Sequence, residues 1–302
     1  MANNNTNNSS NGKSFSHIKR KQTNLPKRII LVRHGESQVN EDEEVLEYIP
    51  NYKIKLSEKG SHQAKETGLK IRDIVSDENT NCKVFFYVSP SNRTRETMEG
   101  IRETFSKEKV IGVGEECRLR EQHFGNFQEV EKRKKIKKTR MRYGKFFYRV
   151  PDGESSADVY DRVSTFLEGL WRDMESNKFS NGPSDTDEVN LIIVSHGLTI
   201  LLFLMKWFNW TVDQFEDLMN PGNCEYRVLQ LGHNEEYSLA IHHKVDELKK
   251  WGLSEQMIED QKRRACGSFG IHLNLKPLKC IDATSDDNVE DHSEEKEIVI
   301  LN

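Results

Sequence analysis

The feature that most constrains the fold of this chain is the alternation of short β-rich runs with stretches of helical periodicity. Three apolar runs with strand character, beginning at Arg28, Lys83 and Val189, are each followed by a helical pattern. Strands that alternate with helices in this way form a mainly parallel sheet covered by helices. We therefore expect an α/β fold, a three-layer sandwich with a mostly parallel central sheet and helices on both faces. The expected strands occupy 28–32, 83–89, 110–114, 189–195, 224–231 and 237–241.

Helix-start signals support this order of elements. Helical patterns begin near Ser57, Ser91 and Leu198, and a longer one runs over 155–176. Ser57 is a suitable N-cap because its hydroxyl can accept a hydrogen bond from a backbone N–H of the first turn, and an acidic residue follows it. The apolar stripe of this first helix is expected to consist of Leu69, Ile71, Ile74 and Val75.

The composition indicates a soluble globular protein. Hydrophobic residues make up 35% of the chain and charged residues 31%, which leaves enough apolar material for a core. No apolar run approaches the roughly 20 residues of a membrane-spanning helix, because the longest candidate, 198–208, contains Lys206. The N-terminus lacks the apolar segment of a secretory signal. The 5 cysteines form no C-x-x-C pair, so we expect a reducing compartment, most simply cytoplasmic, with nuclear and organellar locations left open.

The ends of the chain differ in composition from its middle. Residues 1–26 are rich in Asn and Ser and predict a disordered polar and basic arm, whereas 281–302 hold eight acids and one lysine. This tail contributes −7 to a total charge of −4, so the rest of the chain carries +3, and such like-charged ends are usually disordered. Between them we expect one domain at 27–250, with a basic insertion at about 127–150, and a C-terminal extension at 251–280.

Three of the expected strands end in polar residues of similar type. The first runs into Arg33 and His34, the second into the segment that holds Arg93, and the fourth into His196. Ligands of an open parallel sheet bind beyond the carboxyl ends of its strands, so these loops can converge. Arginine holds two phosphoryl oxygens through its planar fork, and neutral histidine can attack phosphorus near pH 7. Each residue alone has a simpler structural interpretation, but the combination predicts a phosphoryl-transfer site.

An ordered set of short motifs carries a family resemblance. The chain resembles the histidine phosphatase superfamily in its phosphoglycerate-mutase-like branch over roughly 28–245, and more narrowly it is similar to plant phosphoglycerate-mutase-like proteins. The resemblance implies the phosphoglycerate-mutase-like version of the expected α/β sandwich. The motifs, in chain order, are RHGES with Asn40 at the fixed offset, LSEKGSHQA, SPSNRTRET, LREQHFG, DGES and VSHG.

The resemblance implies a role for each residue at the strand ends. His34 would attack phosphorus and become a transient phosphohistidine, with the carbonyl of Gly35 fixing the ring tautomer. Flanking guanidiniums favour the neutral form of His34, because like charges disfavour protonation of the ring. His196 would be protonated and would stabilise charge in the transition state. The residues expected to bind the phosphoryl group are Arg33, Asn40, Arg93 and His196, with Ser37 as an additional ligand.

Cleavage of an unactivated phosphate ester also requires a proton for the departing oxygen. The resemblance places this general acid/base at Glu121, within LREQHFG. Two alternatives stay open: Glu121 is a surface carboxylate paired with Arg118 or Arg120, or His123 is the proton donor. The expected catalytic set is His34, Glu121, His196, Arg33 and Arg93. No metal or other cofactor is expected, since arginines and an imidazolium neutralise the charge that Mg²⁺ handles in a kinase.

The segment 131–149 is densely basic and then aromatic. A solvated helix face is the commonest outcome for such a run. The functional alternatives are a lid that attracts an anionic substrate, a weak contact with an anionic lipid surface, and a nuclear address. We favour the lid among these, because the segment lies between Glu121 and DGES, where this branch inserts substrate-selecting helices.

These features predict a histidine acid-type phosphatase that hydrolyses a small phosphomonoester, in carbohydrate or small-metabolite metabolism. One alternative is a cofactor-dependent phosphoglycerate mutase, whose distinctive insertion and mobile C-terminal region the sequence does not match. A further alternative is a binding or regulatory protein with incidental turnover. The expected partner is a small phosphorylated substrate, no nucleic acid is expected, and the sequence does not define an oligomeric state.

Overall fold

The computed structural model of the protein describes residues 25–76, 81–127, 129–179 and 187–266. Most of the expected N-terminal arm and the whole of the expected acidic tail lie outside the described residues. All described residues fall within one compact unit. Among them, no helix is both long enough and apolar enough to cross a membrane.

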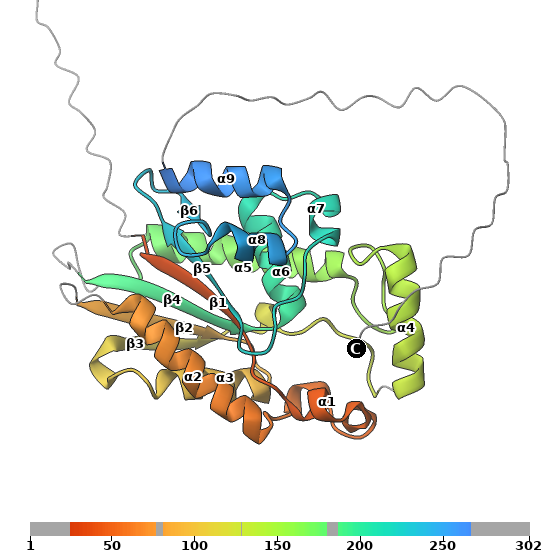
Figure 1. Cartoon of the computed structure of the whole chain (residues 1–302). Helices are drawn as coiled ribbons and strands as arrows, with labels where there is room; N and C mark the ends of the chain where they lie inside the picture. The colour runs from red at the N-terminus through yellow and green to blue at the C-terminus, as the bar shows by residue number, and fades with distance from the viewer. Residues whose placement is uncertain (1–24, 77–80, 128, 180–186, 267–302) are drawn as a thin grey trace, which may run out of the picture. The chain divides into compact units, whose positions relative to one another are not determined.

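A single six-stranded sheet runs through the middle of this unit, in the strand order β3-β2-β4-β1-β5-β6 (Figure 1). β1, β2, β3 and β4 pair in parallel, whereas β5 and β6 are antiparallel. The expected mostly parallel sheet is therefore confirmed. The strands are β1 (Arg28–Arg33), β2 (Cys82–Val88), β3 (Val110–Glu115), β4 (Glu188–Ser195), β5 (Tyr226–Leu231) and β6 (Tyr237–Ser238).

The helices begin where the sequence signals place them. Ser57 caps the first long helix by accepting a hydrogen bond from Gly60 N at 3.0 Å, and Ser155 forms a capping box with Asp158. The α-helices are α1 (Gln38–Glu41), α2 (Glu58–Val75), α3 (Asn92–Arg102), α4 (Val130–Tyr143), α5 (Ser156–Glu175), α6 (Gly197–Phe208), α7 (Val212–Glu216), α8 (Val245–Lys250) and α9 (Glu255–Cys266). Short 3₁₀ turns are η1 (Glu43–Glu47), η2 (Asn51–Lys53), η3 (Lys107–Lys109) and η4 (Cys117–Leu119).

Alternate residues of the central strands point to opposite faces of the sheet and are buried under different helices. The fold therefore has three layers. Ile30 and Val32 of β1 belong to a core with α2 and α3. Ile29 and Leu31 point to the opposite face and belong to a larger core with α5 and α6. The two pairs of helices cover opposite faces of the sheet in Figure 1. The predicted three-layer α/β sandwich is thus confirmed.

The expected apolar stripe of α2 is wrong at one position. Leu69 is 44% exposed, whereas Ile71 and Val75 are fully buried. The buried face of α2 consists largely of small residues, because α3 packs closely against it: a Cβ at Gly68 would lie 2.9 Å from the Cα of Ile101 in α3. Hydrophobicity alone did not identify this close helix contact.

Candidate active site

The two central parallel strands place a histidine at each of their carboxyl ends. β1 and β4 pair in register, with Arg33 opposite Ser195, so His34 and His196 leave the sheet side by side. Their ring centroids are 5.3 Å apart, and both rings are buried. Convergence of these two strand ends was predicted from the sequence, and the structure brings the two residues together.

The ring of His34 is held in one orientation. Its Nδ1 lies 2.7 Å from the carbonyl oxygen of Gly35, which can only accept, so Nδ1 carries the proton and Nε2 keeps its lone pair. Burial lowers the pKa of His34 well below its ordinary value, and the charges of Arg93 and Arg33 lower it further. His34 is therefore a neutral imidazole with a free Nε2 at neutral pH, as the sequence predicted.

The loop after β1 requires glycine because it crosses the start of α2 at very short range. A Cβ on Gly35 would lie 2.6 Å from the carbonyl oxygen of Gly60, and a Cβ on Gly60 would lie 1.9 Å from that of Glu36. Both contacts are with backbone, which cannot move aside as a flexible side chain can. This close crossing fixes the backbone around Gly35, whose carbonyl oxygen orients the ring of His34.

Arg93 places its guanidinium beside both histidines from the first turn of α3. Its Nη1 donates to the carbonyl oxygen of Asn51 at 2.8 Å, and its Nη2 lies 3.3 Å from His196 Nδ1. Arg33 is held by a 2.6 Å hydrogen bond from Nη1 to the carbonyl oxygen of Pro221. Burial lowers the pKa of both arginines, but guanidinium remains charged throughout the physiological range. Two fixed cations thus flank the nucleophile candidate.

The protonation of His196 that is expected during phosphoryl transfer stays a prediction, and in the protein alone the ring is neutral at pH 7. Burial lowers the pKa of His196 well below its ordinary value, and the nearby charges of Arg93 and of His34 when protonated lower it further. Its Nε2 lies 2.8 Å from the hydroxyl of Ser89, at the end of β2. Since the surrounding cations oppose a charge on this ring, protonation of His196 requires more negative charge than the carboxyl group of Glu121 at 3.4 Å can supply, such as that of a phosphoryl group.

Glu121 faces the same group of side chains from the loop after η4. One carboxylate oxygen, Oε2, lies 3.4 Å from His196 Nδ1 and 3.9 Å from Arg93 Nη2. Arg118 pairs with Glu116 and Arg120 pairs with Glu154, both at 2.7–2.8 Å, so neither is the partner of Glu121. The alternative in which Glu121 is a surface carboxylate paired with Arg118 or Arg120 is therefore wrong.

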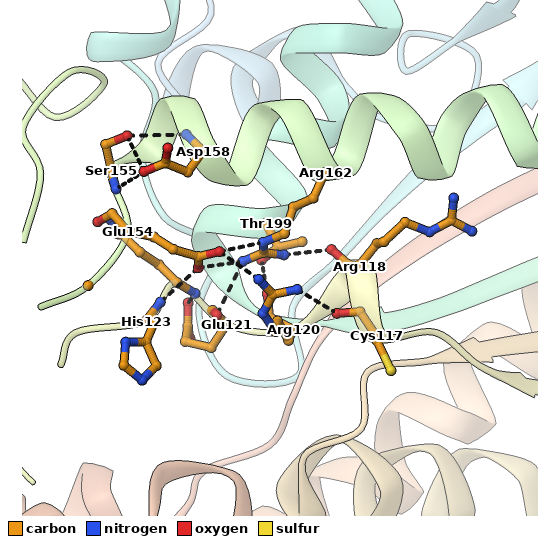
Figure 2. Close-up of polar contacts among 12 residues, drawn as sticks. Cys117, Arg118, Arg120, Glu121, His123, Glu154, Ser155, Asp158, Arg162 and Thr199 are labelled. Atoms are coloured by element: carbon orange, nitrogen blue, oxygen red, sulfur yellow. Dashed lines mark hydrogen bonds and ion pairs between the residues drawn. The ribbon is translucent and has the colours of Figure 1, made fainter. Parts of the chain in front are cut away.

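A salt-bridged network lies behind Glu121 and holds its backbone (Figure 2). Arg162 of α5 donates from Nε and Nη2 to the two carboxylate oxygens of Glu154, at 3.0 and 3.1 Å. The same guanidinium donates to the carbonyl oxygens of Arg118 at 2.5 Å and Glu121 at 3.2 Å. Burial would raise the pKa of Glu154, but the hydrogen bond and charge of Arg162, the N–H of His123 and the charge of Arg120 together outweigh it, and the pKa is lowered. Glu154 is therefore a charged anchor.

The loop is also tied to the segment that carries His196. Ser195 Oγ donates to the carbonyl oxygen of Leu119 at 2.7 Å, and Thr199 Oγ1 donates to that of Arg120 at 3.1 Å. These two hydrogen bonds come from the residues just before and just after the start of α6. The positions of His196 and Glu121 are consequently set by the same piece of the fold.

Asn40 reaches the site, whereas Ser37 does not. Asn40 lines the cavity in front of His34, and its Oδ1 accepts hydrogen bonds from Ser37 Oγ at 2.9 Å and Asn223 Nδ2 at 3.3 Å. Ser37 is fully buried and is not among the residues that line the cavity. Ser37 therefore orients Asn40, and the prediction that it is itself a phosphoryl ligand is not supported by its position.

The cavity in front of His34 measures about 150 Å³, and helix α4 of the basic segment supplies part of its wall. Arg133 and Lys137 line it together with Arg33, Arg93 and Glu121. Both α4 cations also pair with Glu43 of η1, at 3.5 Å and 2.9 Å. The basic segment is thus a helix that docks over the cavity, although the sequence did not identify which of its cations take part.

Three of these residues also have the spacing of a metal site. His34, Glu121 and His196 offer ligand atoms that all lie within 4.8 Å of one another. A divalent cation bound by these three residues would lie close to the guanidinium of Arg93. Nη2 of Arg93 is 3.9 Å from Glu121 Oε2 and 3.3 Å from His196 Nδ1. Repulsion at this range in a buried site is strong, so absence of a metal requirement remains our prediction.

Several residues of the site were missed by sequence reasoning. Ser89 and Glu154 lie within motifs of the family resemblance, and Arg162 lies in the stretch DGESSADVYDRVSTFLE, which is also similar to the plant proteins, so a signal for all three existed. Asn51 and Asn223 lie in no such motif, and only the fold shows that they contact the site.

The fold and the site together define an enzyme of the histidine-phosphatase type. A model of the histidine phosphatase superfamily (branch 1) matches residues 29–243, and the chain belongs to this family. The resemblance predicted from the motifs is confirmed.

Known proteins similar to this chain include both mutase-like proteins and phosphatases. Phosphoglycerate mutase-like protein AT74H of Arabidopsis thaliana is 51% identical over 276 residues, which cover 87% of this chain and 97% of the relative. Broad-range acid phosphatase DET1 of Saccharomyces cerevisiae is 29% identical over 68% of this chain and 86% of its own. A mycobacterial glucosyl-3-phosphoglycerate phosphatase complexed with VO3 has a similar fold, with a TM-score of 0.52 and 22% identity over 70% of this chain and 95% of that one.

Proposed function

We propose that this protein is a phosphatase that hydrolyses a phosphomonoester through a covalent phosphohistidine on His34. One observation carries the proposal: Nδ1 of His34 is engaged with Gly35 at 2.7 Å, which leaves Nε2 free in a cavity that Arg33 and Arg93 also line. An imidazole with a fixed tautomer and a lowered pKa is an activated nucleophile, and fixed cations around it stabilise the charge of a transferring phosphoryl group.

In the first step, a bond forms between His34 Nε2 and phosphorus while the bond from phosphorus to the ester oxygen breaks. Arg33, Arg93 and Asn40 hold the equatorial oxygens, which carry most of the charge of the transferring group. Glu121, in its protonated form, donates its proton to the departing oxygen, and the product alcohol leaves neutral. His196 faces the same oxygens, and the phosphoryl charge opposes the effect of the arginines on its pKa.

In the second step, water replaces the alcohol. Glu121 is now ionised and removes a proton from the water as its oxygen attacks phosphorus. The bond from phosphorus to His34 Nε2 breaks, inorganic phosphate leaves, and both His34 and Glu121 return to their starting forms. One carboxylate serves both steps, because the departing oxygen and the incoming water use the same side of the phosphoryl group.

Trapping of the covalent intermediate tests the proposal. The enzyme is mixed with a ³²P-labelled phosphomonoester, quenched in alkali within milliseconds, and assayed for protein-bound label that is stable to alkali and lost in acid. Wild type and a His62→Ala control, altered at an exposed histidine of α2, should carry the label, and His34→Ala should not. A label that survives His34→Ala would exclude this nucleophile. A 10⁴-fold loss of turnover corresponds to roughly 5 kcal/mol of transition-state stabilisation.

A mutase is the second candidate, because the relative at 51% identity is named phosphoglycerate mutase-like. A mutase would form the same phosphohistidine but return the phosphoryl group to a sugar acid. Incubation with 3-phosphoglycerate and 2,3-bisphosphoglycerate separates the two activities: a phosphatase releases inorganic phosphate, and a mutase forms 2-phosphoglycerate without it.

A further inference from the structure

A second cavity adjoins the phosphoryl cavity at Glu121. Glu121, Asn51 and Phe124 line both cavities, so the two share one wall. The second cavity measures about 370 Å³, within the roughly 300–1,000 Å³ of small-ligand sites, whereas the phosphoryl cavity measures only about 150 Å³. Tyr52, Arg120, Asn126 and Phe127 are among the other residues that line it.

The shared position of Glu121 shows which part of a substrate this second cavity would receive. A general acid must contact the oxygen that it protonates, and that oxygen joins phosphorus to the leaving group. With phosphorus in front of His34 and the ester oxygen at Glu121, the rest of the leaving group continues past Glu121. The second cavity begins at that point.

Three large aromatic residues line the second cavity. Phe124 forms part of its wall, and Tyr52 and Phe127 flank it with 55% and 61% of their surfaces exposed. Large aromatic side chains left this exposed beside a hollow are typical of a binding surface, because they retain apolar area that a ligand can cover. Their flat faces suit a ring better than a flexible chain, since a ring is already rigid when it binds.

The charges around the second cavity disfavour an anionic leaving group. Among the described residues, its lining contains no lysine, its one arginine, Arg120, is engaged with Glu154 at 2.8 Å, and the other basic side chain is that of His123. The cations of α4 line the phosphoryl cavity instead, where Arg133 and Lys137 pair with Glu43. A carboxylate on the leaving group would therefore meet Glu121 without an uncommitted arginine or lysine in that lining.

We propose that the second cavity is the leaving-group site of this enzyme and that it takes an uncharged ring, aryl or sugar, attached to the phosphoryl group through its ester oxygen. The ring lies against Tyr52, Phe124 and Phe127, and the polar groups of Asn51 and Asn126 face its substituents. This inference rests on the proposed function, because it uses Glu121 as the proton donor. A leaving-group site of this kind would favour phosphomonoesters that carry a ring over short charged ones such as 3-phosphoglycerate.

The test compares ring and open-chain substrates whose ester oxygens have similar reactivity. Benzyl phosphate is compared with ethyl phosphate, and glucose 6-phosphate with sorbitol 6-phosphate, so that an aryl ring and a sugar ring are tested separately. The measured quantity is the ratio of kcat/KM for the ring compound to that for its open-chain partner. Wild type should show a ratio well above one in at least one pair, and kcat/KM for 3-phosphoglycerate should be lower than for that ring compound.

Variants then connect the preference to the second cavity. Phe127→Ala and Tyr52→Ala should each lower the ring ratio by roughly 2- to 10-fold, the range expected for one lost aromatic contact. Phe147→Ala is the matched control, since Phe147 is exposed to 63% but does not line the cavity, and its ratio should equal that of wild type. A ring ratio near one in both pairs, or one that neither cavity variant changes, would overturn the inference.

Failure of this inference can be told apart from failure of the proposed function. Binding of benzylphosphonic acid and of ethylphosphonic acid, which cannot be hydrolysed at an ester bond, is measured by calorimetry on wild type and Phe127→Ala. A binding preference for the benzyl compound that Phe127→Ala removes, without phosphate release from any ester, would overturn only the phosphatase assignment. Turnover that depends on His34, with no ring preference in either assay, would overturn only the leaving-group site.

Discussion

Oε2 of Glu121 lies 3.4 Å from Nδ1 of His196, although the two residues come from different loops of the chain. The contact places a carboxylate at the edge of a site that otherwise presents cations and neutral rings. A proton carried by Glu121 is thereby adjacent to the phosphoryl cavity, where a departing oxygen can receive it.

Replacement of Glu121 by glutamine should affect substrates according to their leaving groups. For benzyl phosphate, whose alcohol departs only with a proton, kcat should fall by about 10²- to 10⁴-fold. For 4-nitrophenyl phosphate, whose phenolate needs no proton, the first step should survive and the phosphoenzyme should accumulate, since its hydrolysis lacks the base. Rapid-quench measurement of a nitrophenolate burst checks this. An equal loss for both substrates would contradict the acid role, and Glu44→Gln, an exposed carboxylate of η1, is the control.

The pH dependence of kcat/KM should extend into acid. The pKa of His34 is lowered well below its ordinary value by burial and by Arg93 and Arg33. A lowered pKa means that His34 is still neutral at pH values where an ordinary histidine is already protonated, so the nucleophile is lost only on further acidification. The acid limb should therefore lie well below pH 6.5, the ordinary histidine value. An acid limb at or above that value, with a substrate that does not titrate there, would contradict the assignment.

Arg162 should act as a positioning residue for Glu121. Arg162→Lys keeps a positive charge but cannot make both hydrogen bonds to Glu154 and also reach the two backbone carbonyls. We expect kcat for benzyl phosphate to fall roughly 10- to 100-fold, because small displacements of a catalytic group are costly. The burst with 4-nitrophenyl phosphate should persist, as in Glu121→Gln. A uniform loss with both substrates would indicate a purely structural role.

The exposed lysines of α4 should attract the substrate electrostatically. Replacement of Lys132, Lys135 and Lys138 by glutamine should lower kcat/KM several-fold at low ionic strength, with little effect on kcat. The difference should largely disappear at about 0.5 M salt, where charges are screened over a few ångströms. The same substitutions at Lys107, Lys244 and Lys250, far from α4 in sequence, provide the control. A loss that does not depend on salt would point to a displaced helix instead.

Removal of metal ions should leave the activity unchanged. The site supplies positive charge through Arg33 and Arg93, and the guanidinium of Arg93 would repel a cation held by His34, Glu121 and His196. Prolonged treatment with EDTA, followed by assay in metal-depleted buffer, checks this. Loss of activity that Mg²⁺ or Zn²⁺ restores would contradict the prediction.

The phosphoryl end of the site could be predicted because its residues follow strands whose ends must meet. His34 and His196 leave paired strands, so their proximity follows from the topology. The supporting residues could not be predicted in the same way. Arg162 contacts Glu121 at a separation of 41 residues in the sequence, and Lys137 contacts Glu43 at a separation of 94. No local sequence pattern indicates either contact. The lowered pKa of His196 in the protein alone was not predicted either, because a motif does not show how deeply a ring is buried.

The ties from Ser195 and Thr199 to the loop of Glu121 have a consequence for how such a protein can change. Two hydrogen bonds hold the loop of Glu121 to the residues around His196, whereas Tyr52 and Phe127 of the second cavity are 55% and 61% exposed. We therefore expect substitutions at these two exposed aromatic residues to alter which alcohol is bound more than they alter the contact between Glu121 and His196. Substrate preference could then change during evolution while the groups that cleave the ester bond stay the same.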